Sequence, residues 1–209
     1  MTEQIQLTLY SFRRCPYAMR ARMALSYAKL SYTLREVDLK NKPEALLTAS
    51  PKGTVPVLIV NETQIIDESL DVVGWVSQQT NQPLDFDVNK HVWVEKLHQK
   101  FIPTMHRYKY PERYPEVDQA DNLKLVNDFL TSLDGWLETQ QKDMNPWVEI
   151  ALFPLIRQLW IIDDGWTHAD IPNVTNWVEA ISQSDEFMRV MEKHAVWQSE
   201  ATEPVIIKF

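Results

Sequence analysis

The sequence predicts an α/β domain over roughly the first eighty residues and an all-helical domain after it. Three observations lead to this fold class. Short runs of alternating apolar and polar residues, typical of strands, are interleaved with helix-spaced runs in the first part. Turn residues separate these runs. Beyond a short linker, only the helical period remains. An interleaved order of strands and helices is typical of an α/β domain.

Composition excludes several classes of protein. The 209 residues are 44% hydrophobic and 24% charged, which is typical of a folded globular chain. A net charge of −8 argues against nucleic acid or an anionic membrane as the main partner. The longest apolar run, residues 150–156, is interrupted by Pro154 and is too short to span a bilayer.

The beginning of the sequence and its cysteine usage predict a cytoplasmic location. Met1–Gln4 has neither the basic part nor the apolar part of a secretory signal. The single cysteine allows no disulfide within the chain and suits a reducing compartment. We therefore expect a cytoplasmic protein.

The first domain, residues 1–80, is expected to follow the order β-α-β-α-β-β-α. Its expected strands cover 5–10, 32–39, 57–60 and 64–66, and its helices cover 16–29, 44–49 and 67–79. Two helical crossovers and a closing hairpin imply a mixed sheet, since parallel strands require a crossover and antiparallel strands a tight turn.

The second domain, residues 88–209, follows a linker at 81–87 that contains Pro83. Its expected helices cover 88–105, 119–141, 147–160, 174–182 and 186–192. Pro103 is expected to kink or end the first of them. The proline-rich stretch 108–114 is expected to be a loop or broken helix, and the tail 204–209 to be extended.

Cys15 is the residue on which the functional interpretation depends. It stands directly before Pro16, which predicts a helix start there and places the sulfur near unpaired N–H groups. Such sites lower a cysteine pKa to about 3.5–7.5 from about 8.5. Ala18 occupies the place of the second cysteine in a C-x-x-C turn, so we predict a reactive single thiol. The competing interpretation is a small buried apolar residue. Nearby basic residues of the favourable sign are Arg13, Arg14, Arg20 and Arg22.

Two further features of the first domain suggest a ligand site. Pro56 lies at the start of a strand, where a cis Val55–Pro56 bond would explain it. Glu68 and Ser69 lie at a helix N-terminus, which can bind a carboxylate through its N–H groups. The alternative for this pair is a plain helix cap with an acidic first turn.

We expect no metal site. His91, Glu95 and His98 would share one face of a helix, but they supply at most a partial ligand set. A polar helix face accounts for them.

Taken together, in this order and spacing, the features of residues 5–80 resemble the glutathione transferase family, especially its cysteine-bearing omega class and related bacterial members. The resemblance implies a thioredoxin-like first domain, an all-helical second domain and a homodimer. The segments that carry it are Tyr10–Ser11, Cys15–Ala18, Arg20-x-Arg22, Leu39–Glu44, Ser50–Leu58 and Asp67–Ser69.

A stretch of the second domain, residues 150–158, resembles the core helix of the same family. Its beginning departs from the family pattern. Pro146 and Glu149 stand where a Ser/Thr cap and an Asp are usual. We expect Asn145 to cap this helix instead.

The resemblance also implies a site for glutathione, the co-substrate. Cys15 corresponds to the thiol that forms a mixed disulfide with it, and Lys42 to a cation for one of its carboxylates. Val55, before a cis-Pro56, corresponds to the backbone that pairs with the glutathione cysteine. Glu68 and Ser69 correspond to contacts for its γ-glutamyl group. Candidates for the acceptor pocket are Tyr17, Tyr108 and Trp160.

Three functions are consistent with these residues. The first is a glutathione-dependent thiol transferase acting by mixed-disulfide exchange, deglutathionylation or dehydroascorbate-type reduction, on a small hydrophobic or thiol-bearing acceptor. The second is conjugation of glutathione to electrophiles, with Tyr10 or Ser11 activating the bound thiol. The third is a binding or protein-interaction module with little turnover. The missing second cysteine favours the first function, because the partner thiol must then come from outside the chain.

Overall fold

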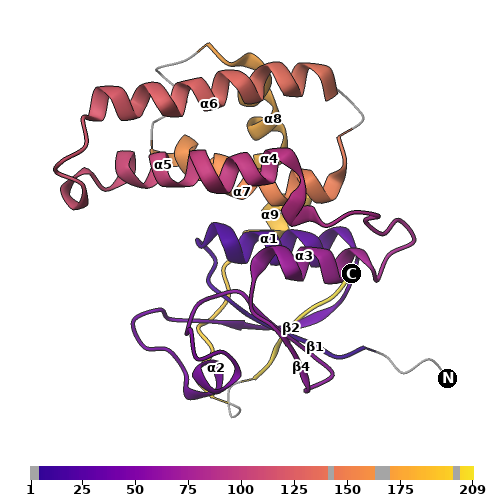
Figure 1. The fold of residues 1–209 in the computed structure, drawn as a ribbon. Coiled ribbons are helices and arrows are strands. Elements are labelled where there is room, and N and C mark those ends of the chain that lie inside the picture. The colour runs from indigo at the N-terminus through magenta and orange to yellow at the C-terminus, as the bar shows by residue number, and fades with distance from the viewer. Residues whose placement is uncertain (1–4, 141–143, 163–169, 200–202) are drawn as a thin grey trace. The chain divides into compact units, whose positions relative to one another are not determined.

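The computed structural model describes residues 5–140, 144–162, 170–199 and 203–209 and divides the chain into two compact units (Figure 1). The first unit comprises residues 1–85 and 185–209, and the second comprises residues 86–184. The last 25 residues therefore belong to the first unit, whereas the sequence prediction placed them in the helical domain.

The described part of the first unit contains one mixed sheet in the order β4-β3-β1-β2-β5. Its strands are Leu7–Ser11 (β1), Tyr32–Glu36 (β2), Val57–Val60 (β3), Gln64–Ile66 (β4) and Val205–Ile207 (β5). β1 and β2 run parallel, and the other neighbouring strands run antiparallel. Leu9 in β1 and Leu58 in β3 are fully buried, as the middle of a sheet requires.

Strand β5 explains why the C-terminal residues leave the helical domain. Val205, Ile206 and Ile207 are β-branched and favour extended structure. They pair antiparallel with β2, where Tyr32 faces Ile207 and Leu34 faces Val205. This pairing covers an edge of the sheet that would otherwise be open. The sequence predicted an extended tail, but not that it pairs with β2, whose residues lie 171 to 175 positions earlier.

Helices cover both sides of this sheet. Pro16–Tyr27 (α1) and Ser69–Ser77 (α3) pack side by side on one face, and Glu44–Ala49 (α2) lies on the other side (Figure 1). Asp185–Val190 (α9) packs against α1. The predicted order β-α-β-α-β-β-α is confirmed, and the unit is a thioredoxin-like α/β domain.

The regular elements in the described part of the second unit are all helical. Its elements are Val88–Lys90 (η1), Val92–Lys96 (α4), Leu97–Phe101 (η2), Ile102–Lys109 (α5), Pro111–Arg113 (η3), Gln119–Gln140 (α6), Pro146–Ile162 (α7) and Pro172–Ser182 (α8). Its largest fully buried side chains include Phe101, Trp147 and Phe153. Among the residues that the structure describes, no helix is long and apolar enough to cross a membrane.

Pro103 does not end the helical stretch, so the predicted alternative in which the helix stops at this residue is wrong. The chain forms a π-helical turn at η2 immediately before it and then continues as α5 to Lys109. A proline ring collides with the carbonyl group four residues earlier in a regular α-helix. The wider turn places Pro103 in the first turn of a new helical segment, where its missing N–H is tolerated.

The predicted cap of α7 is confirmed. The Trp147 N–H donates to Asn145 Oδ1 at 2.9 Å, so the amide side chain caps the helix in place of a serine or threonine. Helix α7 contains Pro154 and is nevertheless continuous to Ile162.

Asp134 should stabilise the second unit by capping α8 from another helix. Its carboxylate accepts from the Val174 N–H and from Asn173 Nδ2, each at 2.9 Å, while Ile171 provides no side-chain cap. We expect Asp134→Ala to lower the free energy of unfolding by about 1–2 kcal/mol, measured by urea denaturation. Glu138→Ala, an exposed acid on the same helix, is the control and should change it by about 0.5 kcal/mol or less.

Glu149 should make the stability of the second unit depend on pH. Burial raises the pKa of its carboxyl group, although the hydrogen bond from Trp177 Nε1 at 2.9 Å lowers it. A raised folded-state pKa means that the folded chain holds its proton more tightly, so stability decreases as pH rises through that window. Glu149→Gln keeps the acceptor and loses the charge. We expect it to be more stable than wild type at pH 7, with the difference disappearing below about pH 4 in thermal unfolding. An equal difference at both pH values would contradict this explanation.

Candidate active site

Cys15 lies at the junction between β1 and α1, as the N-cap residue of the helix. Its N–H donates to the Phe12 carbonyl at 3.0 Å, and its carbonyl accepts from the Met19 N–H at 2.9 Å. Pro16 begins the helix, because it needs no hydrogen-bond acceptor for a backbone N–H. The turn and the proline together place the thiol at the positive end of α1.

The thiol of Cys15 contacts the segment that leads into β3. Its Sγ donates to the Val55 carbonyl oxygen at 3.7 Å, and the Val55–Pro56 peptide bond is cis. Val55 and Pro56 belong to the loop before β3 in which the sequence suggested a ligand site. Val55 lies 40 positions after Cys15 in the chain. Cys15 is partly buried against the apolar cluster that contains Tyr10 and Val55.

Opposing effects act on the ionisation of Cys15. Burial raises the pKa of the thiol above its ordinary value. The N–H groups of Ala18 and Tyr17 lower this pKa, and so do the charges of Arg22 and Arg20, but burial is the largest effect. The predicted lowering of the thiol pKa is therefore wrong. The sequence identified the helix terminus and the arginines but not how deeply the sulfur is packed.

Lys42 and the turn at residues 50–53 lie close together. Gly53 has φ = +60°, and a Cβ atom there would lie 3.4 Å from Lys42 Nζ and 3.0 Å from Leu47 Cδ2. A glycine is thus required both by the backbone conformation and by the close approach of these side chains. Lys42 itself is exposed, two residues before α2 begins.

Lys52, in the same turn, connects to the acidic residues before α3. Its Nζ lies 2.6 Å from Glu68 Oε1 and 3.1 Å from Asp67 Oδ1. Asp67 also accepts from the Ser50 hydroxyl at 2.7 Å, and this hydrogen bond, with Lys52, lowers the pKa of Asp67. Glu68 keeps 64% of its side chain exposed and is the N-cap residue of α3.

Ser69 is buried, in contrast to its neighbour Glu68. Its hydroxyl accepts from Arg20 Nη1 at 3.2 Å, and Arg20 is fully buried. Burial lowers the pKa of the Arg20 guanidinium to about 10, so this group remains positively charged at neutral pH. The guanidinium also stacks on the ring of Tyr17, 5.6 Å from its centroid.

The two hydroxyl groups considered as alternative activators are both engaged elsewhere. Tyr10 is buried, and its hydroxyl accepts from Arg35. The Ser11 hydroxyl is fully buried and accepts from Arg22 Nη1 at 2.7 Å.

The three residues predicted to line an acceptor pocket fall in different units. Tyr17 is a half-buried residue of α1 in the first unit. Tyr108 in α5 and Trp160 in α7 are half-buried residues of the second unit. The acceptor pocket therefore stays a prediction.

In the part of the chain that the structure describes, no three His, Cys, Asp or Glu side chains gather as a metal site. His91 caps α4 through its Nδ1, which accepts from the Trp93 N–H at 3.3 Å. His98 and Glu95 lie in the same stretch of helical turns.

The structure shows three contacts that sequence reasoning did not predict. Lys52 pairs with Glu68, Arg20 bonds to Ser69, and Glu36 accepts from the Arg13 N–H at 2.6 Å. Lys52 lies within the turn that carried the family resemblance, so its position was a usable signal. Glu36 lies near the end of a strand in an ordinary alternating pattern, and nothing in the sequence distinguished it.

Comparison with known proteins agrees with this geometry. Residues 9–84 match the family model described as the N-terminal domain of glutathione S-transferase. Glutathione S-transferase omega-1 of Mus musculus is 24% identical over 192 residues, which cover 85% of this chain and 77% of that protein. Glutathione S-transferase omega-2 of Rattus norvegicus is 39% identical over 64 residues, 31% of this chain but only 26% of that protein. A probable glutathione S-transferase DHAR2 of Oryza sativa is 23% identical over 194 residues, covering 85% and 65%.

Solved structures extend the likeness of fold to most of the chain. Glutathione transferase Omega 3C from Trametes versicolor superimposes with a TM-score of 0.71 at 18% identity and covers 91% of each chain. The transferase URE2P6 from Phanerochaete chrysosporium, solved in complex with oxidized glutathione, has a TM-score of 0.73 at 14% identity, covering 91% of this chain and 96% of that one. The family model over residues 9–84 and the omega-class relatives support a glutathione transferase family member with omega-like character, and the solved structures show the same fold over most of the chain.

Proposed function

We propose that this chain is a glutathione-dependent thiol transferase whose nucleophile is Cys15. The observation that carries the proposal is the position of the sole cysteine. It caps the N-terminus of α1 and reaches the carbonyl of Val55 beside a cis-Pro56. A thiol at this place can exchange with a disulfide, and with no second cysteine the chain cannot resolve that disulfide by itself.

The proposed binding residues suit an anionic tripeptide. Lys42 offers an exposed cation, and the Val55 backbone offers a strand-like edge beside Cys15. Glu68 presents an exposed carboxylate that can accept from the ammonium of the γ-glutamyl group. The N–H of Ser69 lies in the first turn of α3, where a carboxylate is stabilised.

The proposed reaction runs through two exchanges. The Cys15 thiolate attacks the glutathione sulfur of a mixed disulfide, and the acceptor leaves as a thiolate that takes up a proton. The glutathionyl group is then bound to Cys15 through a new S–S bond. A second glutathione thiolate attacks the glutathione sulfur of this bond, so that oxidised glutathione leaves and the Cys15 thiolate is regenerated. A raised thiol pKa reduces the thiolate fraction but increases its intrinsic nucleophilicity.

Conjugation through Tyr10 or Ser11 is the weaker candidate. The hydroxyls of both residues are held by Arg35 and Arg22. Tyr10 and Ser11 are 1% and 0% exposed, so a glutathione thiol would have to enter the core to accept a hydrogen bond from either hydroxyl.

A panel of three assays tests the proposal. Purified protein is supplied with glutathione and a glutathionylated peptide, with dehydroascorbate, or with a chlorinated aromatic electrophile. We expect turnover of at least one of the first two substrates and little of the third. Conjugation alone would overturn the proposal, and glutathione binding without any turnover would support the binding-module alternative. Sedimentation at the assay concentration tests the homodimer, which stays a prediction.

A further inference from the structure

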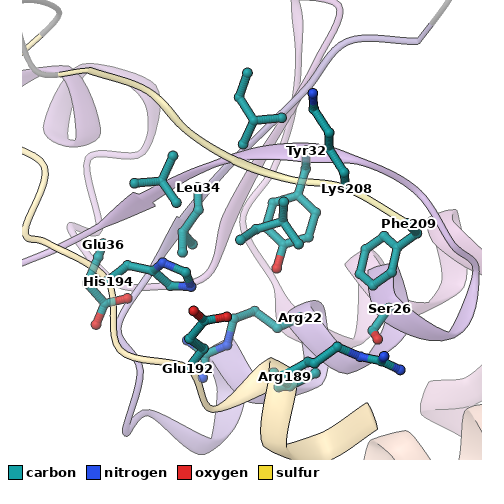
Figure 2. A pocket seen from close by; sticks show the side chains of 14 residues that line it. Arg22, Ser26, Tyr32, Leu34, Glu36, Arg189, Glu192, His194, Lys208 and Phe209 are labelled. Carbon is teal, nitrogen blue, oxygen red and sulfur yellow. The ribbon is translucent and has the colours of Figure 1, made fainter. Parts of the chain in front are cut away.

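Arg22 in α1 reaches into the loop that precedes Cys15. Its Nη1 donates to the Ser11 hydroxyl at 2.7 Å, and its Nη2 donates to the Arg13 carbonyl at 2.6 Å. Glu36 in β2 accepts from the Arg13 N–H at 2.6 Å, so the backbone of this one residue is held from both sides. Figure 2 shows the side chains of Arg22, from α1, and Glu36, from β2, lining the same cavity.

The environment of Arg22 is unusual for a buried cation. The side chain is only 3% exposed, yet the hydrogen bonds of its Nη atoms go to a hydroxyl and a carbonyl rather than to a carboxylate. Its Nε has no hydrogen-bond partner among the described residues. Buried arginines are normally paired with an acid, because burial of an uncompensated charge is unfavourable. Departures from such rules are concentrated at functional positions.

The positive charge of Arg22 acts on Cys15. It is the largest of the charge effects that favour the thiolate, and Arg20 gives the next. The opposing contribution is the burial of the sulfur, which only nearby positive charge or N–H groups can offset.

Other charged groups surround Arg22 and must be considered in any pH dependence. Tyr32 and Glu36 face it from β2, and Arg13 faces it from the loop. The segment after α9 adds Met191, whose Sδ lies 4.0 Å from Arg22 Nη2. It also adds Glu192 and His194, which line a cavity of about 280 Å³ together with Arg22 (Figure 2). On the side of the sulfur lie Arg20 and Tyr17.

We propose that Arg22 is a positioning residue for Cys15: it fixes the end of β1 and the loop of residues 12–14 through Ser11 and Arg13, and it keeps a buried positive charge against the loop that leads to the thiol. Glu36 completes this arrangement by holding the Arg13 N–H. The inference rests on the proposed role of Cys15 in thiol exchange. Arg22 thus has two separable effects. One is on the ionisation of the Cys15 sulfur, and the other is on the geometry of the loop that precedes Cys15.

Two variants of Arg22 separate these effects. Because Cys15 is the only cysteine, its alkylation by iodoacetamide reports its ionisation without interference. We expect Arg22→Gln to move the midpoint of the alkylation rate to higher pH and to lower the rate at pH 7 by about three- to tenfold. Arg22→Lys should keep the midpoint, because it keeps the charge. It should still slow glutathione exchange about tenfold, because lysine cannot form the forked pair of bonds.

Ser11→Ala and Arg189→Gln complete the set. Ser11→Ala removes one acceptor and leaves the charge, so exchange should slow about threefold with an unchanged alkylation midpoint. Arg189 borders the same cavity but is exposed and lies 3.6 Å from Glu186, so Arg189→Gln should behave as wild type. Thermal unfolding of each variant verifies that it is folded.

The outcomes divide clearly. An unchanged midpoint in folded Arg22→Gln, with exchange within about twofold of wild type, overturns the inference. If Arg22→Gln does not fold, unchanged exchange in both Arg22→Lys and Ser11→Ala overturns it instead. If wild type performs no exchange, the proposed function fails, and the alkylation profiles alone decide whether Arg22 controls the thiol.

Discussion

Cys15→Ser is expected to lower the rate of glutathione exchange by about a thousandfold or more. A serine hydroxyl is not ionised at neutral pH and cannot form a disulfide, so both proposed exchanges lose their nucleophile. The substitution is nearly isosteric and preserves a hydrogen-bond donor for the Val55 carbonyl. The measurement is the steady-state rate of mixed-disulfide reduction with saturating glutathione.

Cys15→Ala is the matched variant, since it removes the hydrogen bond to Val55 as well as the sulfur. We expect the same loss of exchange in both, with glutathione affinity within about threefold of wild type. Retention of more than about a tenth of the rate in Cys15→Ser would transfer the catalytic role to another group. Dependence of the residual rate on Tyr10 or Ser11 would then identify a hydroxyl that activates the bound glutathione thiol directly.

Glu68→Gln is expected to raise the KM for glutathione by about ten- to a hundredfold while kcat changes by less than about threefold. A charge-assisted bond to the substrate ammonium is made equally in the ground state and the transition state, so its loss appears in KM. Glu68 is well placed for this contact because most of its side chain is exposed at the N-terminus of α3.

Lys52→Gln separates contact with glutathione from the ion pair that Glu68 makes with Lys52. Lys52 Nζ lies 2.6 Å from Glu68 Oε1, and the substrate ammonium would compete for the same carboxylate. We expect Lys52→Gln to leave KM unchanged or lower it. An increase in KM equal to that of Glu68→Gln would mean that Glu68 acts by holding Lys52 rather than by binding glutathione.

Local patterns in the sequence were sufficient to predict most of the fold. The bounds of α2, β3 and β4 were predicted to the residue, because turn residues delimit each of them. The π-helical turn before Pro103 and the pairing of β5 with β2 were not predicted. The periodicity of residue types does not reveal either feature. The π-helical turn relieves a steric conflict of the proline ring, and the β5–β2 pairing covers an open edge of the sheet.

The candidate site, too, was predicted only in part from the sequence. The sequence singled out Cys15, Val55 and Glu68, and the structure places Cys15 against Val55 and pairs Glu68 with Lys52. It did not indicate that burial outweighs the helix terminus at the thiol, nor that Arg22 and Glu36 hold the preceding loop. Desolvation depends on how side chains from distant segments pack, which a pattern of residue types does not contain.

A crystal structure of the protein soaked with oxidised glutathione tests the central claim most directly. We expect continuous density between Cys15 Sγ and one glutathionyl sulfur, with an S–S distance of about 2 Å, and the γ-glutamyl ammonium against Glu68. Glutathione bound with its sulfur unattached to Cys15 and directed at Tyr10 or Ser11 would contradict it.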